Sequence, residues 1–103
     1  MAITILQWLQ RFYQEQANGD WEHTYGIKIE TVDNPGWWIC IDLADTDYAD
    51  LHDISLTETV TDSDWYFYRF ANKQFTASGD LSKLEFLLCK FREQIEKKRA
   101  LIS

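Results

Sequence analysis

The chain has 103 residues, of which 46 % are hydrophobic and 16 % aromatic, with four glycines and one proline. This composition excludes a disordered chain, and the length predicts a single compact domain, residues 1–103, with its own hydrophobic core. The longest apolar run, residues 37–41, is too short to cross a membrane, and the first residues lack the basic and long apolar regions of a signal peptide. We therefore expect a cytoplasmic protein without a membrane partner.

The net charge of −7 is unevenly distributed along the chain. Residues 20–64 contain twelve acidic residues and one base, Lys28, whereas the remaining residues contain five acidic residues and nine bases. An acidic surface of this kind repels the phosphates of nucleic acids and attracts a basic partner. It argues against direct binding of DNA or RNA. The plain alternative is that the charge only keeps a small protein soluble.

The first predicted element is an amphipathic helix over residues 3–17. Apolar side chains recur there at helical spacing, and mostly glutamines and charged residues occupy the opposite face. Asn18-Gly19 ends the helix, because glycine readily adopts the positive φ that is common at a helix C-terminus. The period then changes to two over residues 25–30, which predicts a half-buried strand.

A turn at Asn34–Trp37 leads into the next strand. Pro35 fixes its own φ at roughly −65°, and we expect Gly36 to adopt the positive φ of a type II turn. The strand Trp37–Leu43 places its odd-numbered side chains on one face and its even-numbered side chains on the other. The polar loop Ala44–Asp53 follows and contains four aspartates.

Two further strands are predicted at Ile54–Thr61 and Trp65–Ala71, and a short fifth stretch, Phe75–Ala77, adds an edge. The last helix begins near Asp80, its expected N-cap, and runs to about Leu101. The fold class is therefore α+β. It consists of an N-terminal helix, an antiparallel meander of four to five strands and a C-terminal helix, with both helices on one face of the sheet.

If both helices cover one face, the other face of the sheet is partly open. Strand alternation offers two sets of aromatic side chains for the open face: Trp38 with Tyr66 and Tyr68, or Trp37 with Trp65 and Phe67. The sequence leaves this choice open. Large aromatic side chains at a surface commonly anchor protein interfaces, although the same residues also serve simply to fill a small core.

No catalytic or metal-binding constellation stands out in the sequence. The two histidines, His23 and His52, each have neighbouring carboxylates, but nothing in the spacing brings the two groups together. Residues 45–56 begin like a calcium-binding loop and then lack the required glycine and final glutamate. Cys40 and Cys89 lie within a predicted strand and helix, which favours packed thiols over a nucleophile or a disulfide. We therefore expect no enzyme activity, no cofactor and no bound metal.

Two sequence blocks are distinctive: WEH-x-YGI, starting at Trp21, and DNPGW, starting at Asp33. Together they resemble the Imm53 immunity proteins of bacterial polymorphic toxin systems. The resemblance implies a small cytosolic protein that binds a cognate toxin domain and blocks it without catalytic residues. We expect the motif positions to specify the fold, through turns, the entry to a strand and packing, more than the interface. These positions are Asp20, Trp21, Glu22, His23, Tyr25, Gly26, Asn34, Pro35, Gly36, Trp37 and Asp42.

For the toxin contact we predict a combination of carboxylates and aromatic anchors. A nuclease toxin carries a basic cleft for phosphates, and an acidic inhibitor can occupy such a cleft, with electrostatic steering speeding association. The candidate residues are Asp45, Asp47, Asp50 and Asp53 for charge, and Tyr48, Trp38, Tyr66 and Tyr68 as anchors.

Two alternatives to toxin binding stay open. The first is a small non-catalytic adaptor, in which exposed aromatic side chains join two copies into a homodimer. The second is a hydrolase or metal-dependent enzyme centred on His23 and the carboxylates of Asp20 and Glu22.

Overall fold

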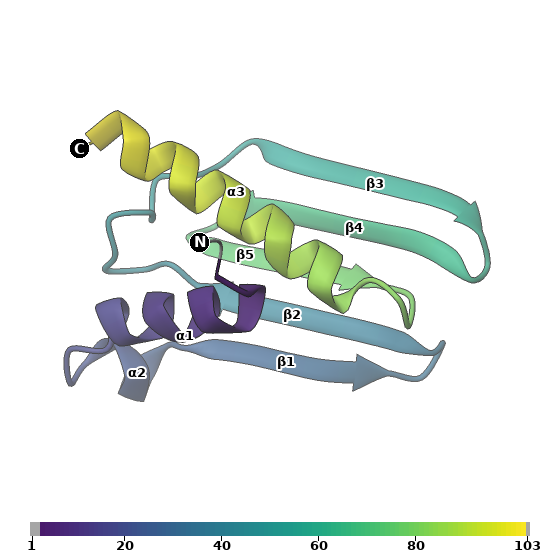
Figure 1. The fold of residues 1–103 in the computed structure, drawn as a ribbon, viewed down its shortest axis with the longest axis horizontal. Helices are drawn as coiled ribbons and strands as arrows, with labels where there is room; N and C mark the ends of the chain where they lie inside the picture. The colour runs from purple at the N-terminus through teal and green to yellow at the C-terminus, as the bar shows by residue number, and fades with distance from the viewer. Residues whose placement is uncertain (1–2, 103) are drawn as a thin grey trace.

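Five antiparallel strands form one open sheet, and helices lie across one of its faces (Figure 1). The computed structural model describes residues 3–102. The α+β class and the two terminal helices are confirmed. In chain order the elements are α1 (Ile5–Gln16), α2 (Trp21–Thr24), β1 (Ile27–Val32), β2 (Gly36–Asp42), β3 (Ile54–Thr61), β4 (Asp64–Ala71), β5 (Gln74–Gly79) and α3 (Leu84–Ile102).

The strand order is β1-β2-β5-β4-β3, and every neighbouring pair is antiparallel. The expected meander is therefore broken once, because the chain leaves β2, crosses to the far edge to form β3 and returns through β4 to β5. The prediction that the fifth strand is an edge is wrong, since β5 lies between β2 and β4. Its composition suits the centre of the sheet: Phe75 and Ala77 are fully buried, and Ser78 and Gly79 are buried as well.

Helix α1 begins with a capping box, which satisfies two backbone groups at its N-terminus. The N–H of Gln7 donates to the Thr4 hydroxyl over 3.1 Å, and the N–H of Thr4 donates to Gln7 Oε1 over 3.0 Å. The apolar face of the helix buries Trp8 and Phe12. Both rings meet Phe91 of α3 edge-on, with centroids 5.9 Å and 5.1 Å away, so the two helices pack through aromatic contacts.

Helix α3 begins at Leu84, later than the predicted N-cap at Asp80. The N–H of Leu87 donates to the carbonyl of Lys83 over 2.9 Å, which makes Lys83 the N-cap residue. Asp80 instead holds the turn before the helix by accepting from the N–H of Ser82 over 2.7 Å. Along α3, the fully buried Phe91 stacks on Phe70 of β4 and lies 5.0 Å from the ring of Phe75 of β5, so this helix covers the centre of the sheet.

The strand register assigns the aromatic side chains to the two faces of the sheet. Trp37 and Tyr66 both pair with Gly79, from opposite sides of β5, and therefore share a face. That face is the one covered by helices, because the ring of Tyr66 lies 4.7 Å from that of Phe86 on α3. Tyr68, two residues further along β4, lies on the same face.

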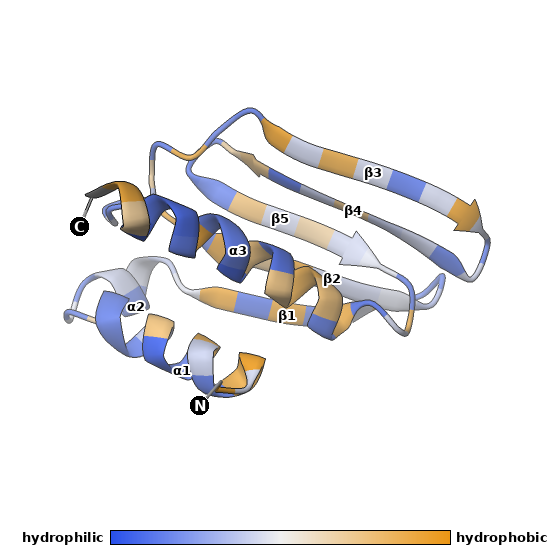
Figure 2. Ribbon diagram, turned by 45° about the horizontal axis from the view of Figure 1, so that its top comes forward, coloured by the Kyte–Doolittle hydropathy of each residue, from blue (hydrophilic) through white to orange (hydrophobic). Residues whose placement is uncertain are grey.

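The opposite, open face carries Trp38 and Phe67, which both pair with Ser78 of β5, together with Trp65. Neither predicted aromatic set is therefore correct, since each one mixes residues of the two faces. The alternation of side chains shows which residues of one strand share a face. The register of β2 and β4 with β5 decides which residues of different strands share a face. Figure 2 shows α1 and α3 on the same side of the sheet, and β3 along an edge away from α1.

Candidate functional site

The loop between β2 and β3 carries all four predicted carboxylates. Asp45 and Asp47 are exposed, and the side chain of Asp53 is 91 % exposed, 3.6 Å from the ring of His52. Asp50 accepts a hydrogen bond from Lys98 Nζ over 2.7 Å, and this bond lowers the pKa of Asp50. Within residues 3–102, Lys98 is the only lysine or arginine paired with these carboxylates. The loop therefore presents negative charge to solvent.

Tyr48, predicted as an anchor for a partner, lies inside the protein. It is 5 % exposed, and its hydroxyl accepts a hydrogen bond from Arg99 Nε over 2.9 Å. Its ring lies 5.9 Å from the ring of Phe12. Tyr48 thus fixes the acidic loop to both α1 and α3, and a partner can reach little of its surface.

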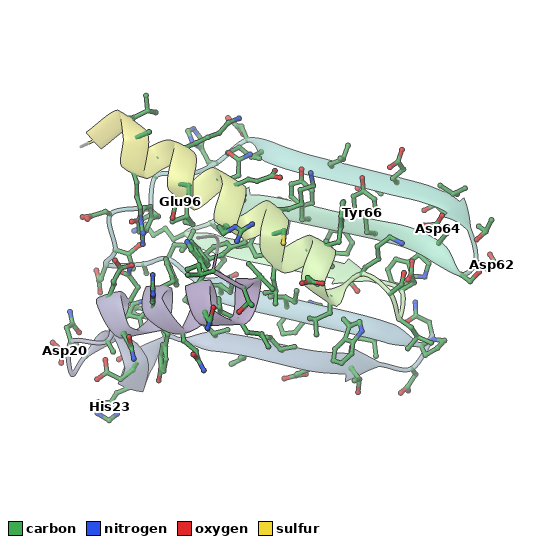
Figure 3. The ribbon with its side chains drawn as sticks, in the orientation of Figure 1. Asp20, His23, Asp62, Asp64, Tyr66 and Glu96 are labelled. Carbon is green, nitrogen blue, oxygen red and sulfur yellow. The ribbon has the colours of Figure 1, made fainter. Side chains whose placement is uncertain are left out.

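The other predicted anchors do not form one patch. Trp38 is half-buried on the open face of the sheet, whereas Tyr66 and Tyr68 lie on the helix-covered face. The two tyrosine rings are stacked, with centroids 6.5 Å apart. Partial burial and the hydrogen bond that the Tyr66 hydroxyl donates to Glu58, over 2.9 Å, raise the pKa of Tyr66. Both tyrosines pair with residues of β3, where the exposed Glu58 lies opposite Tyr66, and Figure 3 shows Tyr66 on the strand that begins near Asp64 and the turn at Asp62.

The open face holds an aromatic group that alternation within single strands did not identify. Trp38, Trp65 and Phe67 are half-buried there, and Ser78 lies between Trp38 and Phe67. The hydroxyl of Ser78 donates to the Trp37 carbonyl over 2.8 Å, so this small residue is internally satisfied. Only the pairing of β2 and β4 with β5, which is not visible in the sequence, brings these aromatic residues together.

A network of ionic contacts joins the β3–β4 turn to the start of α3, and the sequence pattern gave no sign of it. Lys83 Nζ contacts Asp64 and Asp80, each over 2.9 Å. The buried Asp80 carboxylate also accepts from the N–H of Trp65 over 2.9 Å and from Ser82. Burial alone would raise the pKa of Asp80, but hydrogen bonds from Ser82, Lys83 and Trp65 outweigh it and lower that pKa. The network stabilises the fold at this end of the sheet.

The first motif, residues 21–27, together with Asp20 before it, forms α2 and the entry to β1. Trp21 is 2 % exposed and packs beside Tyr13 of α1. Glu22 accepts from the N–H groups of Asn18 and Gly19, over 2.9 Å and 2.8 Å, and local backbone hydrogen bonds lower its pKa. The Asn18 side chain accepts from the N–H of Trp21 over 3.0 Å, whereas Asp20 makes no side-chain cap. These contacts organise the turn between α1 and the sheet.

Three further positions of the first motif have a simpler setting. His23 is exposed on α2 and points away from the protein body (Figure 3). Tyr25 is half-buried, and Gly26 has a φ of +126°, a conformation that glycine adopts with least strain. Leu6, Leu9, Tyr13, Tyr25 and Gly26 line a groove of about 500 Å³ between α1 and the start of β1.

The second motif shapes the β1–β2 hairpin. Asn34 and Pro35 are exposed in the turn. Gly36 does not have the predicted positive φ; it begins β2, where an added Cβ would lie 2.3 Å from the Gly79 carbonyl oxygen. The indole N–H of Trp37 donates to the Leu81 carbonyl over 3.0 Å. Asp42, at the end of β2, accepts from the Gln74 side-chain amide over 2.8 Å.

The groups that a catalytic or metal site would need are dispersed. No group of three or more histidine, cysteine, aspartate or glutamate side chains in the described part of the chain could hold a metal ion. Cys40 and Cys89 are free thiols, and burial raises the pKa of Cys40, which disfavours its reactive thiolate form. Among the helices between residues 3 and 102, none is long and apolar enough to span a membrane.

Comparison with known proteins identifies the family. The chain belongs to the Imm53 family, because the model of that family, described as Immunity protein 53, matches residues 6–96. Comparisons with curated proteins and with solved structures gave no match. The family points to toxin immunity and implies that the partner is a toxin protein.

Proposed function

We propose that this chain is a non-catalytic inhibitor that binds a cognate bacterial toxin domain in the cytoplasm and covers part of it. Its membership of an immunity-protein family carries the proposal. The dispersed histidines and the buried Cys40 support inhibition by binding, since a catalytic role needs groups that converge on one point.

The charge of the surface indicates which kind of toxin fits. Residues 44–64 contain seven acidic residues and no lysine or arginine. Asp45, Asp47 and Asp53 project from the loop at one end of this segment, and Asp62 and Glu58 are exposed further along it. Carboxylates at such positions take the place of substrate phosphates in a basic cleft and steer association over a distance. We therefore propose a basic toxin, with a nuclease as its class.

The positions of the aromatic anchors support one place for the proposed contact. A single toxin surface reaches either Trp38 on the open face or the Tyr66–Tyr68 pair on the helix-covered face. The tyrosine pair lies beside the acidic residues of β3, and Tyr66 itself binds Glu58. We therefore place the toxin contact along residues 44–64 and this pair, with Asp50 and Tyr48 holding the loop in position.

The open face favours a second candidate function, a small adaptor that self-associates. Trp38, Trp65 and Phe67 are gathered there without a covering helix, and such aromatic groups commonly anchor protein interfaces. Sedimentation of the isolated chain distinguishes the two. A monomer is expected for the toxin inhibitor, and a dimer that Trp38→Ala dissociates would favour the adaptor.

The decisive experiment is a calorimetric titration of this chain with the toxin domain encoded beside its gene, at low and high salt. We expect tight binding that weakens as salt screens the carboxylates. Tight binding without salt dependence would leave immunity in place and remove the electrostatic mechanism. Absence of both binding and inhibition would contradict the proposed function for this toxin.

A further inference from the structure

Strand β3 is an edge strand with few of the usual protections against pairing with another chain: one charged residue, Glu58, and an irregular register between Thr59 and Thr61. Its eight residues include no lysine, arginine or proline, and seven of them are exposed. Leu56 is 44 % and Val60 66 % exposed. Natural sheets commonly protect long edges with lysine, proline or a covering element. The other edge, β1, is shorter and carries Lys28 and Glu30.

The direction of the β3 backbone groups follows from one contact of β4. The N–H of Trp65 donates to the Asp80 side chain over 2.9 Å, and the Trp65 carbonyl accepts from the N–H of Asp80 over 3.1 Å. The backbone N–H and C=O groups of Trp65 therefore point away from β3. Because the direction of these groups alternates along a strand, those of Tyr66 and Tyr68 point towards β3.

The partners of these tyrosines on β3 are Glu58 and Leu56, whose backbone groups are used in the β3–β4 ladder. The intervening residues, Ser55, Thr57 and Thr59, must then turn their N–H and C=O groups outward. Three alternate residues therefore each leave an N–H and a C=O group free. Their spacing is the one at which an added antiparallel or parallel strand forms its hydrogen bonds.

The surroundings of this edge favour one kind of occupant. Leu56 lies opposite Tyr68 and Glu58 opposite Tyr66, which gives an added strand both apolar surface and a carboxylate beside its side chains. The segment 44–64 contains seven acidic residues and no lysine or arginine of its own, and Lys98 and Lys83 pair with two of the seven, Asp50 and Asp64. A second copy of this chain would bring two such segments together, and like charges across a strand pair are destabilising. A segment of a partner that is rich in lysine or arginine would instead face the opposite charge of these carboxylates.

We propose that β3 is a docking edge, along which an extended segment of the toxin domain, rich in lysine or arginine, pairs as a sixth strand. Main-chain hydrogen bonds at Ser55, Thr57 and Thr59 provide the pairing. Glu58 and the aspartates at both ends of β3 select the basic segment. This inference rests on the proposed function and specifies the contact that performs it.

Proline substitution tests the edge, with a matched control on the opposite side of the sheet. Thr57→Pro removes one outward N–H and leaves the ladder with β4 intact. Thr31→Pro is the control: the Gly26 carbonyl accepts from the N–H of Asp42 over 3.1 Å, so alternation turns the exposed Thr31 outward on β1. We expect both variants to melt as the wild type does. Thr57→Pro should weaken binding of the toxin domain encoded beside the gene by about 10- to 100-fold, and Thr31→Pro should leave it unchanged.

Amide hydrogen exchange of the wild-type complex provides a measurement that needs no variant. We expect slower exchange at Ser55, Thr57 and Thr59 when the toxin domain is bound. Unchanged exchange there, or equal affinities of the two proline variants, would overturn the docking edge while the proposed function stands. A wild-type dimer that Thr57→Pro dissociates would show that a second copy occupies the edge and would also overturn it. If the wild type neither binds nor inhibits the toxin domain, the proposed function and this inference both fail.

Discussion

Gly36 at the start of β2 lies directly against the backbone of Gly79 at the end of β5. A Cβ atom on Gly36 would come within 2.3 Å of the Gly79 carbonyl oxygen and 3.3 Å of the Trp65 indole. The close approach joins the β1–β2 hairpin to the centre of the sheet. It also gives Gly36 a role that does not depend on a positive φ, in contrast to the type II turn predicted for this position.

Gly36→Ala should therefore destabilise the fold by about 1–3 kcal/mol, because backbone on both sides must move to admit the methyl group. The control is Gly19→Ala, at a site with a φ of +96° and no atom within 4 Å of the added Cβ. Only backbone strain opposes that change, and it should cost about 1 kcal/mol. Urea unfolding of the two variants measures both values. A smaller loss for Gly36→Ala than for Gly19→Ala would contradict the close approach.

Because of the buried Asp80, the stability of the fold should depend on pH in the acidic range. Both of its oxygens accept hydrogen bonds, from Ser82 on one side and from Trp65 and Lys83 on the other. In Asp80→Asn an NH₂ group replaces one of the two oxygens. This group is itself a donor, and it faces a donor of Ser82, Trp65 or Lys83 with which it cannot form a hydrogen bond. We expect a loss of about 2 kcal/mol in the free energy of unfolding at neutral pH.

The pH dependence of this loss has a definite sign. The pKa of Asp80 is lower in the folded chain than its ordinary value of 3.8, so the carboxylate stabilises the fold above that pH. This contribution disappears as pH falls through the lower, folded-state pKa. Melting temperatures at several pH values should thus show a gap between wild type and Asp80→Asn that is constant near neutrality and narrows below about pH 4. Asp62→Asn, an exposed change in the β3–β4 turn, should show no comparable gap.

Tyr48 should contribute to stability more than to toxin contact, because it is buried between α1 and α3. Tyr48→Phe removes only the hydroxyl that accepts from Arg99 and should cost about 1 kcal/mol. Tyr48→Ala also removes the ring and should cost about 3–5 kcal/mol. Thermal melts give the stabilities, and titration with the toxin domain gives the affinities. If Tyr48→Phe melted at the wild-type temperature but bound the toxin domain more weakly, Tyr48 would instead belong to the interface.

The sequence predicted local structure well where one residue pattern determines it. The boundaries of β3 agree with the prediction, and the apolar spacing of α1 and α3 located both helices. The strand order was not accessible in this way. Alternation is a property of one strand, whereas the central place of β5 depends on which distant strands bury Phe75 and Ala77 from both sides.

The candidate site shows the same division. The exposed positions of Asp45, Asp47 and Asp53 agree with their place in a polar loop. The burial of Tyr48 depends on Phe12 and Arg99, which are distant in sequence, and no local pattern indicates it. The weakly protected edge of β3 does have a sequence signal, since residues 54–61 lack lysine, arginine and proline. That signal becomes informative only when the strand is known to lie at an edge.

The loop carboxylates should act mainly on the rate of association. In the double variant Asp45→Asn/Asp47→Asn, both changes are at exposed positions, and the melting temperature should stay close to that of the wild type. Removing two charges weakens steering, so the association rate with the basic toxin domain should fall by about 3- to 10-fold at low salt. The dissociation rate should change less, and the difference in association rate should shrink as salt rises. Stopped-flow mixing at several salt concentrations measures these rates.

The matched control for this pair is Glu85→Gln/Glu93→Gln on α3, which changes the net charge by the same amount at two exposed positions. A site-specific role of the loop predicts a clear rate loss for the aspartate pair and a smaller one for the glutamate pair, since steering depends on where the charges lie relative to the contact. Equal losses would show that only the net charge matters and would remove the acidic loop from the proposed contact.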